Sequence, residues 1–297
     1  MPKSLQPLQD RAGIVAERKL LGLIRSPCRM VSRALARFTF PRRIVLLYHS
    51  IGTAGHSVSL GMFREQMSYL ADHMRVVTFD QMLEDPDSAD DGITCAITFD
   101  DGYANFYEKA FPILNHFGFS SLIYVTTGAI CDVDPGISNR YPGLFPGEKM
   151  LTWTMLSELI QHRVSVGSHL SRHIDMTQLS RAEAMAELDQ SHSAITNSLG
   201  VPCSHFAYPF GKFTEDNVRW VSEAGYKSGT TVEHRIMPSS LDAFRIPRMC
   251  VAPIHGLKDF KAMLRGDLDY LRLVQKLRNS LGISYPVLVH DAGSAAR

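Results

Sequence analysis

The sequence predicts an α/β protein, a distorted (β/α) barrel with about seven parallel strands. The chain has 297 residues, of which 45% are hydrophobic and 21% charged, with a net charge of +1. These values describe a globular protein whose core is large enough to fold without disulfide bonds. From residue 44 onward, apolar runs typical of buried strands alternate with stretches of helical spacing, which indicates parallel strands covered by helices. The number of repeats in this length favours closure of the sheet into a barrel.

Seven segments have the length and apolar content of strands, and five segments between them have helical spacing. The predicted strands are 44–48, 74–78, 93–99, 119–125, 164–168, 203–207 and 226–230. The predicted helices are 61–73, 104–117, 152–161, 180–199 and 214–224. Ser180 is the expected N-cap of its helix, with Glu183 at the capping-box position. The stretch 131–150 is rich in Asp, Pro and Gly, so we expect a long surface loop there.

Charge divides the chain into a basic N-terminal arm, partly helical, at residues 1–43 and a barrel with a C-terminal helical extension at residues 44–297. The arm carries ten Lys and Arg residues against two acidic residues, whereas the remainder carries 21 basic and 28 acidic residues. Because the total charge is close to zero, a nucleic-acid partner is not expected.

A helix in the arm is predicted to be amphipathic. Its apolar face consists of Met30, Val31, Ala34, Leu35 and Phe38, and its basic face of Arg29, Arg33 and Arg37. Two interpretations are open. In the one we favour, the apolar face packs against the barrel and the arginines remain in water. In the other, the helix makes contact with an anionic membrane surface.

The expected location is the cytoplasm, with a peripheral position at the inner face of the membrane as the variant that the basic arm suggests. Five scattered cysteines without C-x-x-C spacing favour free thiols in a reducing compartment over disulfides or a thiolate zinc site. No apolar run reaches the roughly 18 residues that span a bilayer. The residues Glu17-Arg18-Lys19 interrupt the apolar stretch that a signal peptide would need.

Chemically active residues follow three predicted strands, at the carboxyl ends where barrel enzymes carry their active sites. Asp100 and Asp101 come directly after strand 93–99, where carboxylates without partners would be costly. His169 and His173 follow strand 164–168 at a spacing that lets two imidazoles converge on one metal ion. Taken singly, one Asp can be a helix N-cap and the histidine pair can be incidental.

Together these residues point to metal-assisted hydrolysis of an acyl bond. One Asp and two His provide three ligands and leave a coordination position for water, which is the pattern of a catalytic metal site. The other Asp is then available as a general base.

The same residues carry a resemblance to a known family. Thr98-Phe99-Asp100-Asp101-Gly102-Tyr103, His169 with His173, and Tyr208-Pro209-Phe210-Gly211 occur in the order and at the separations of the polysaccharide deacetylases of carbohydrate esterase family four. The resemblance covers residues 44 to 264. With Leu47-Tyr48-His49-Ser50, the sequence is most similar to the poly-N-acetylglucosamine deacetylase branch, in which the barrel order is permuted.

The resemblance implies a role for each motif residue. Asp100 corresponds to the catalytic base. Asp101, His169 and His173 correspond to the ligands of one divalent ion, usually zinc, with cobalt or nickel as alternatives.

The third motif corresponds to the substrate side of the site. The resemblance implies that Tyr208 and Phe210 help to form the wall of the sugar site. It also implies that the metal and the backbone N–H of Phe210, which follows the turn proline Pro209, hold the oxyanion.

Two positions depart from the family pattern. Leu170 stands where Ser or Thr usually follows the first histidine, and Ser168 or Ser171 is expected to supply the missing hydroxyl contact. Ala207 stands where an Arg usually orients the catalytic Asp. We expect Arg248 to replace that Arg, although a surface salt bridge is an equally simple role for it.

The family also uses a late histidine as general acid toward the departing amine, and two residues are candidates here. His49 follows the first predicted strand, which would direct it into the barrel mouth. His290 follows the apolar run 285–289. We favour His49.

The resemblance therefore implies a metal-dependent hydrolase that removes N-acetyl groups from an amino-sugar polysaccharide or a glycan precursor. Its expected partner is an N-acetylated carbohydrate. An O-deacetylase of a bacterial exopolysaccharide is the close alternative. A catalytically inactive carbohydrate-binding barrel is the alternative from another class, and the two departures from the family pattern motivate it.

Overall fold

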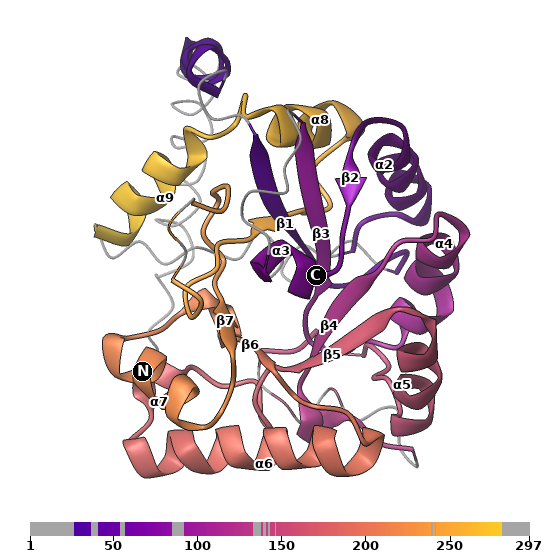
Figure 1. Cartoon of the computed structure of the whole chain (residues 1–297), viewed down its shortest axis with the longest axis vertical. Helices are drawn as coiled ribbons and strands as arrows, with labels where there is room; N and C mark the ends of the chain where they lie inside the picture. The colour runs from indigo at the N-terminus through magenta and orange to yellow at the C-terminus, as the bar shows by residue number, and fades with distance from the viewer. Residues whose placement is uncertain are drawn as a thin grey trace, which may run out of the picture.

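A curved sheet of parallel strands forms the centre of the molecule in the computed structural model, and helices surround it (Figure 1). The structure describes residues 27–36, 41–53, 57–84, 92–132, 138, 141, 143–145, 147–238, 240 and 242–280. The strand order is β7-β6-β5-β4-β3-β1-β8, with the short strand β2 also paired to β3. Every described strand pair is parallel, which confirms the predicted distorted (β/α) barrel.

The strands are β1 (Arg42–Tyr48), β2 (Arg75–Val76), β3 (Ile93–Phe99), β4 (Ser121–Val125), β5 (Val164–Ser168), β6 (His205–Ala207), β7 (Ser228–Thr230) and β8 (Met249–Cys250). The helices are α2 (Leu60–His73), α3 (Phe79–Glu84), α4 (Phe111–His116), α5 (Trp153–Leu159), α6 (Arg181–Leu199), α7 (Glu215–Glu223), α8 (Leu257–Arg265) and α9 (Leu271–Ser280). A helix also spans residues 27–36, called the N-terminal helix below. Within the described residues, no helix is both long and apolar enough to cross a membrane.

The strand register brings the motif residues to one edge of the sheet. Tyr48 pairs with Phe99, so that His49 and Asp100 are the residues that follow two strands ending side by side. The N–H of Asp100 donates to the carbonyl of Tyr48 at 3.0 Å, and the N–H of His169 donates to the carbonyl of Val125 at 2.9 Å. The site predicted from the sequence therefore lies at the carboxyl ends of adjacent strands.

Most of the predicted elements appear in the structure, but the predicted strand 74–78 is reduced to β2, and α3 and β8 lie where no element was predicted. Strands 93–99 and 164–168 have the predicted bounds, and the Ser180–Glu183 capping box begins α6. The predicted helix 104–117 instead begins with a π-helical turn at Phe106–Ala110, directly after the Asp100–Tyr103 motif. Wider turns of this kind occur frequently beside functional sites.

The described residues of the stretch 131–150 do not all lie at the surface as expected of a surface loop. Leu144, Phe145 and Met150 are buried and pack against Tyr103 and Ala129. Among the described residues of the stretch, Phe145 lines the pocket. The Asp, Pro and Gly content of this stretch did not predict that some of its apolar side chains are buried.

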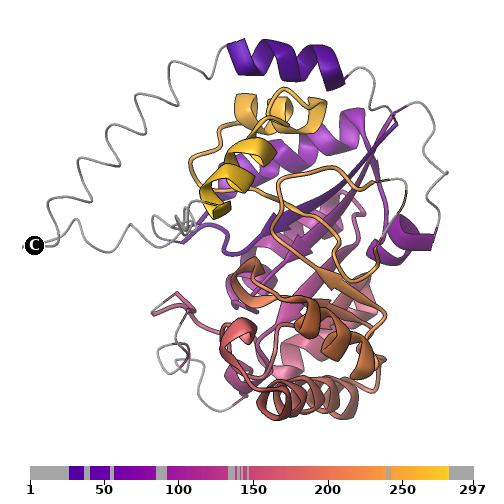
Figure 2. The ribbon, with the colours of Figure 1, turned by 90° about the vertical axis from the view of Figure 1, so that its left-hand side faces the viewer.

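The favoured interpretation of the N-terminal helix is wrong. The helix contacts the rest of the molecule through Ser32 and Ala36, which are buried, while Met30, Val31 and Leu35 are exposed. The Ser32 hydroxyl accepts a hydrogen bond from the N–H of Tyr270 at 3.0 Å, and Ala36 lies against Gly266. Small residues allow the helix to approach the turn between α8 and α9 closely, which leaves its larger apolar side chains on the outside. Figure 2 shows this helix above α8 and α9.

Candidate active site

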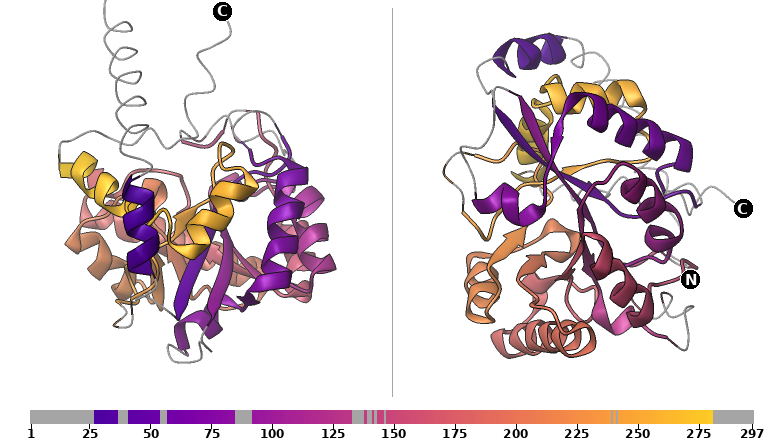
Figure 3. Two further views of the ribbon diagram at one scale, coloured as in Figure 1. Left: turned by 90° about the horizontal axis from the view of Figure 1, so that it is seen from above. Right: turned by 45° about the vertical axis from the view of Figure 1, so that its right-hand side comes forward.

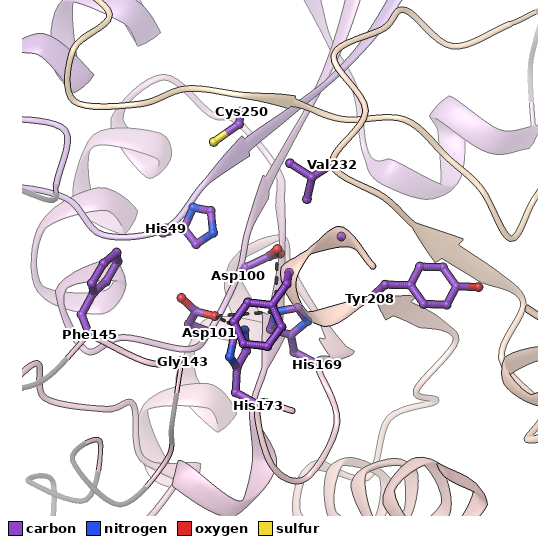
Figure 4. Close-up of a pocket in the computed structure, with 12 residues that line it drawn as sticks. His49, Asp100, Asp101, Gly143, Phe145, His169, His173, Tyr208, Val232 and Cys250 are labelled. Atoms are coloured by element: carbon purple, nitrogen blue, oxygen red, sulfur yellow. Dashed lines mark ion pairs between the residues drawn. The ribbon is translucent and has the colours of Figure 1, made fainter. Parts of the chain in front are cut away.

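A pocket lies at the carboxyl ends of the strands and collects residues from each of the predicted motifs (Figure 4). Segments far apart in the chain supply its lining: His49, Asp100, Asp101, Gly143, Phe145, His169, His173, Tyr208, Phe210, Gly211, Val232 and Cys250. Eight of the nine residues predicted to form the site lie in or against this pocket, since Arg248 contacts Asp100 directly behind it. Pro209 connects two lining residues and is buried.

Three side chains form a set that could hold a metal ion. The Oδ1 of Asp101 lies 3.6 Å from the Nε2 of His169 and 3.5 Å from the Nε2 of His173. Atoms that bind a tetrahedral zinc ion at its usual bond lengths lie about 3.4 Å apart. All three residues are buried, and their ligand atoms lie within 4.8 Å of one another. The donor set therefore fits a divalent ion such as zinc.

The orientation of His169 presents a lone pair to this position. Its Nδ1 lies 2.8 Å from the carbonyl oxygen of Ala207. Because a carbonyl can only accept, Nδ1 carries the proton and Nε2 is available as a ligand. Burial lowers the pKa of His169 in spite of the nearby Asp100 carboxylate, so the ring stays neutral, as a metal ligand must. Ala207, which stands where the family usually has an Arg, thus contributes its backbone carbonyl.

The environment of Asp101 favours a bound cation. Burial, reinforced by the negative charge of Asp100, raises the pKa of Asp101 to about 8. Its Oδ1 has no hydrogen-bond partner among the described residues. Such a group is costly unless a positive charge offsets it, and a bound divalent ion would restore the ionised form.

Backbone strain is concentrated at the site. Asp101, Leu170 and Phe210 adopt left-handed φ angles of 75°, 66° and 60°, and Arg163 is the fourth non-glycine residue of this kind in the described chain. Such conformations cost of order 1–3 kcal/mol each and persist where the surrounding structure enforces them. At Leu170, the N–H donates to the Ser168 hydroxyl at 3.2 Å, so Ser168 contacts the position where the family usually has a hydroxyl residue.

Arg248 forms a bidentate ion pair with Asp100. Its Nη1 and Nη2 donate to the two carboxylate oxygens at 2.6 and 2.7 Å, and its Nε donates to the carbonyl of Thr231 at 3.1 Å. Arg248 is fully buried, so the geometry is that of an interior pair and not of a surface salt bridge. Burial alone would raise the pKa of Asp100, but the Arg248 charge and hydrogen bonds lower it below its usual value.

His49 lies beside Asp100 at the pocket wall (Figure 4). Burial raises the pKa of Asp100, Arg248 lowers it most, and His49 adds a smaller lowering. The alternative acid, His290, lies outside the described residues.

A buried polar network that we did not predict supports the loop carrying His49. The Glu148 carboxylate accepts from Thr53 Oγ1 at 2.6 Å, from Ser50 Oγ at 3.3 Å and from Asn105 Nδ2 at 3.2 Å. Asn105 Oδ1 in turn accepts the backbone N–H of Ile51 at 2.9 Å. The network connects the residue after His49 to the 141–150 stretch. No sequence motif identifies Glu148, because exposed residues stand on both sides of it, Gly147 and Lys149.

Tyr208 and Phe210 lie at the pocket as predicted. The Tyr208 hydroxyl donates to the carbonyl of Phe244 at 3.1 Å, which turns it away from the reacting groups and leaves its ring at the wall. The Phe210 ring contacts His173 edge to face, with centroids 4.4 Å apart. Phe210 therefore also orients a candidate metal ligand.

Four further lining residues carry no motif that would have identified them. A Cβ on Gly143 would lie 2.3 Å from Nδ1 of His173, so only glycine lets this loop approach the ligand. Phe145 and Val232 provide apolar walls. Burial raises the pKa of Cys250 to about 12, which keeps its thiol neutral beside the acidic groups.

The chain is similar to known polysaccharide deacetylases over the part that contains the site. Residues 87–229 match the sequence model of the family described as polysaccharide deacetylase. The Bacillus subtilis protein YxkH, named as a candidate polysaccharide deacetylase, is 24% identical over 214 residues, which cover 70% of this chain and 71% of that protein. The poly-beta-1,6-N-acetyl-D-glucosamine N-deacetylase of Staphylococcus aureus is 23% identical over 210 residues, which cover 66% of this chain and 68% of that protein.

Two solved structures share the fold. IcaB from Ammonifex degensii has a TM-score of 0.62 and 23% identity, covering 76% of this chain and 97% of that one. The Streptococcus pyogenes deacetylase PplD has a TM-score of 0.63 and 20% identity, covering 75% of this chain and 98% of that one.

Proposed function

Because this chain contains a polysaccharide deacetylase domain, and is thus a hydrolase, we propose that it removes N-acetyl groups from an amino-sugar polysaccharide or glycan precursor. One observation carries the proposal: an ionised carboxylate, Asp100, lies beside a three-residue metal-ligand set and takes no part in it. The S. aureus relative that acts on poly-β-1,6-N-acetylglucosamine supports an N-acetylated glucosamine polymer as the substrate class.

The residues of this chain can be assigned to the steps of amide hydrolysis. Asp101, His169 and His173 would hold a divalent ion, zinc or else cobalt or nickel, which when bound acidifies a water molecule and polarises the acyl carbonyl. Asp100 accepts the proton of the attacking water. Arg248 holds that carboxylate in one orientation and keeps it ionised.

Other groups act on the substrate. The N–H of Phe210 stabilises the charge that develops on the acyl oxygen. His49 delivers a proton to the departing amine nitrogen from the pocket wall beside Asp100. The ring of Tyr208 completes the wall of the sugar site.

Acetate release tests the proposal. The full chain is incubated with N-acetylated β-1,6- and β-1,4-glucosamine oligomers and with an aryl acetate, after chelation and after addition of zinc, cobalt or nickel. Release from an oligomer that stops on chelation and returns with metal is the expected result. Release from the ester alone would favour O-deacetylation. No release from protein that holds one metal ion would favour a binding barrel.

Single substitutions separate the roles. Asp100→Asn should retain the metal and lower turnover by about 100-fold or more, since the base is lost and the ligands remain. Asp189→Asn, at an exposed position on α6, is the matched control. Full activity of Asp100→Asn with normal metal content would show that the base is misassigned. His49→Ala and His290→Ala, compared directly, identify the acid.

A further inference from the structure

We propose that the N-terminal helix and α9 together form a docking surface for an anionic lipid bilayer, called the docking face below. Its apolar residues are Met30, Val31, Leu35, Leu273 and Leu277. The proposal goes beyond the hydrolytic function and does not depend on it.

The docking face gathers most of the exposed apolar side chains of the described structure. The described residues include seven large hydrophobic residues that are exposed by 40% or more, and five of the seven lie on these two helices. Their exposures are 73% for Met30, 59% for Val31, 60% for Leu35, 69% for Leu273 and 62% for Leu277. Scattered exposed apolar residues are ordinary, but a cluster on adjacent elements marks an interaction site.

The two helices are neighbours in space although they are far apart in the sequence. The N-terminal helix rests on the turn that leads into α9, through the Ser32–Tyr270 hydrogen bond and through Ala36 against Gly266. Arg33 approaches Asp267 of the same turn at 4.0 Å. Figure 3 shows the N-terminal helix beside α8 and α9 in both views. The inner faces of both helices are therefore occupied, and the apolar outer faces are left to solvent.

Charge favours lipid over a second copy of the chain. The described side chains of the two helices include basic residues and no acidic one: Arg29, Arg33, Arg272 and Lys276, of which Arg33 approaches Asp267 and Arg272 pairs with Glu233. Two copies of such a face would bring like charges together, whereas anionic headgroups would neutralise them. Apolar residues bordered by Lys and Arg on a helix lying flat are typical of an interfacial contact. Neither helix is long and apolar enough to span the bilayer, so the contact is peripheral.

The docking face lies directly behind one wall of the active-site pocket. On the inner face of α9, Gln275 Nε2 donates to the carbonyl of Val232 at 2.6 Å, and Gln275 Oε1 accepts the N–H of His234 at 3.0 Å. Val232 lines the pocket. A bilayer on the outer face of α9 would therefore lie about one helix diameter, roughly 10 Å, from the pocket wall. Docking would hold the pocket at the membrane surface.

Vesicle flotation of the full chain tests the proposal. Vesicles of phosphatidylcholine with phosphatidylglycerol are compared with vesicles of phosphatidylcholine alone. We expect the wild-type chain to float with the anionic vesicles only, and added salt to release it. Leu35→Glu with Leu277→Glu should reduce the bound fraction at least tenfold. Leu60→Glu, at an exposed leucine on α2 outside the docking face, should leave it unchanged.

A second variant and a second measurement keep the outcome decisive. If the double Glu variant does not fold by circular dichroism, Arg33→Gln with Lys276→Gln replaces it, with about a fivefold loss expected for each charge removed near the lipid surface. Wild-type chain that does not bind anionic vesicles overturns the proposal, as does full binding by either double variant. A dimer in sedimentation that the Glu variant abolishes would overturn it in favour of a second copy. Acetate release from soluble oligomers reports the active site separately.

Discussion

Replacing Arg248 by Met tests whether the buried ion pair sets the charge of Asp100. The substitution keeps the unbranched apolar stem of the side chain, shortens its end and removes both hydrogen bonds to the carboxylate. It also removes the bond to the carbonyl of Thr231. Both partners are almost completely buried, so water does not replace the guanidinium next to Asp100, and among the described residues the smaller effects of His169 and His49 are what remains to lower the pKa of the carboxylate.

Removing one member of such a pair leaves an uncompensated buried charge. The cost is about 3–5 kcal/mol of unfolding free energy, which is a large share of the roughly 5–15 kcal/mol that stabilises a typical domain. In a chain of this length, a loss of that size lowers Tm by roughly 6–20 °C. Asp100→Asn in the same molecule removes the stranded charge, so the double variant should recover much of the loss.

The effect depends on pH with a defined sign. In the wild-type chain the pKa of Asp100 is lowered, so its contribution to stability is present above its unfolded pKa of about 4 and is lost as pH falls through the folded value. Without Arg248, burial raises the pKa of Asp100, and stability is lost as pH rises above about 4. The difference in unfolding free energy between the two proteins should therefore widen from about pH 4 to pH 7.

Urea unfolding followed by circular dichroism, in chelator and at several pH values, measures this difference. Arg181→Met is the matched control, because Arg181 pairs with Glu223 at the surface and its loss should cost less than about 1 kcal/mol. A difference that does not change with pH, or a double variant as unstable as Arg248→Met alone, would refute the ion-pair reasoning. Either result would mean that Arg248 acts only by filling space.

Two further predictions concern the metal site and the support of His49. Because the pKa of Asp101 is raised to about 8, metal-free protein should lose stability as pH rises from about 4 to 8, and the gain in Tm on adding zinc should increase over the same range. An equal gain in Tm at pH 5 and pH 8 would count against this prediction. Asp101→Asn is the control. Glu148→Gln weakens the network under the loop of His49, so turnover should fall roughly tenfold or more with unchanged metal content. Parallel measurements of acetate release and metal content check this. Unchanged turnover would show that the network only stabilises the fold.

The local patterns of the sequence predicted those parts of the molecule that depend on neighbouring residues. Strand 93–99 followed by Asp100 and Asp101 appears in the structure with the predicted bounds, and so does strand 164–168 followed by His169. Apolar runs, capping residues and strand ends are local features. In a parallel sheet, such strand ends meet at one edge whatever the remaining packing.

Other features depended on contacts between distant segments. The sequence offered Arg248 as a candidate, but only the fold brings its guanidinium to Asp100 across 148 positions. The burial of apolar residues in the 141–150 stretch and the exposed face of the N-terminal helix likewise follow from which surfaces meet. Hydrophobic spacing identifies an apolar face, and the neighbouring element determines whether that face is covered. The sequence thus determined the main strands and the motif residues that follow them, while the tertiary structure decided the partner of the Asp100 carboxylate and the surfaces left uncovered, because burial and ion pairing are properties of the assembled chain.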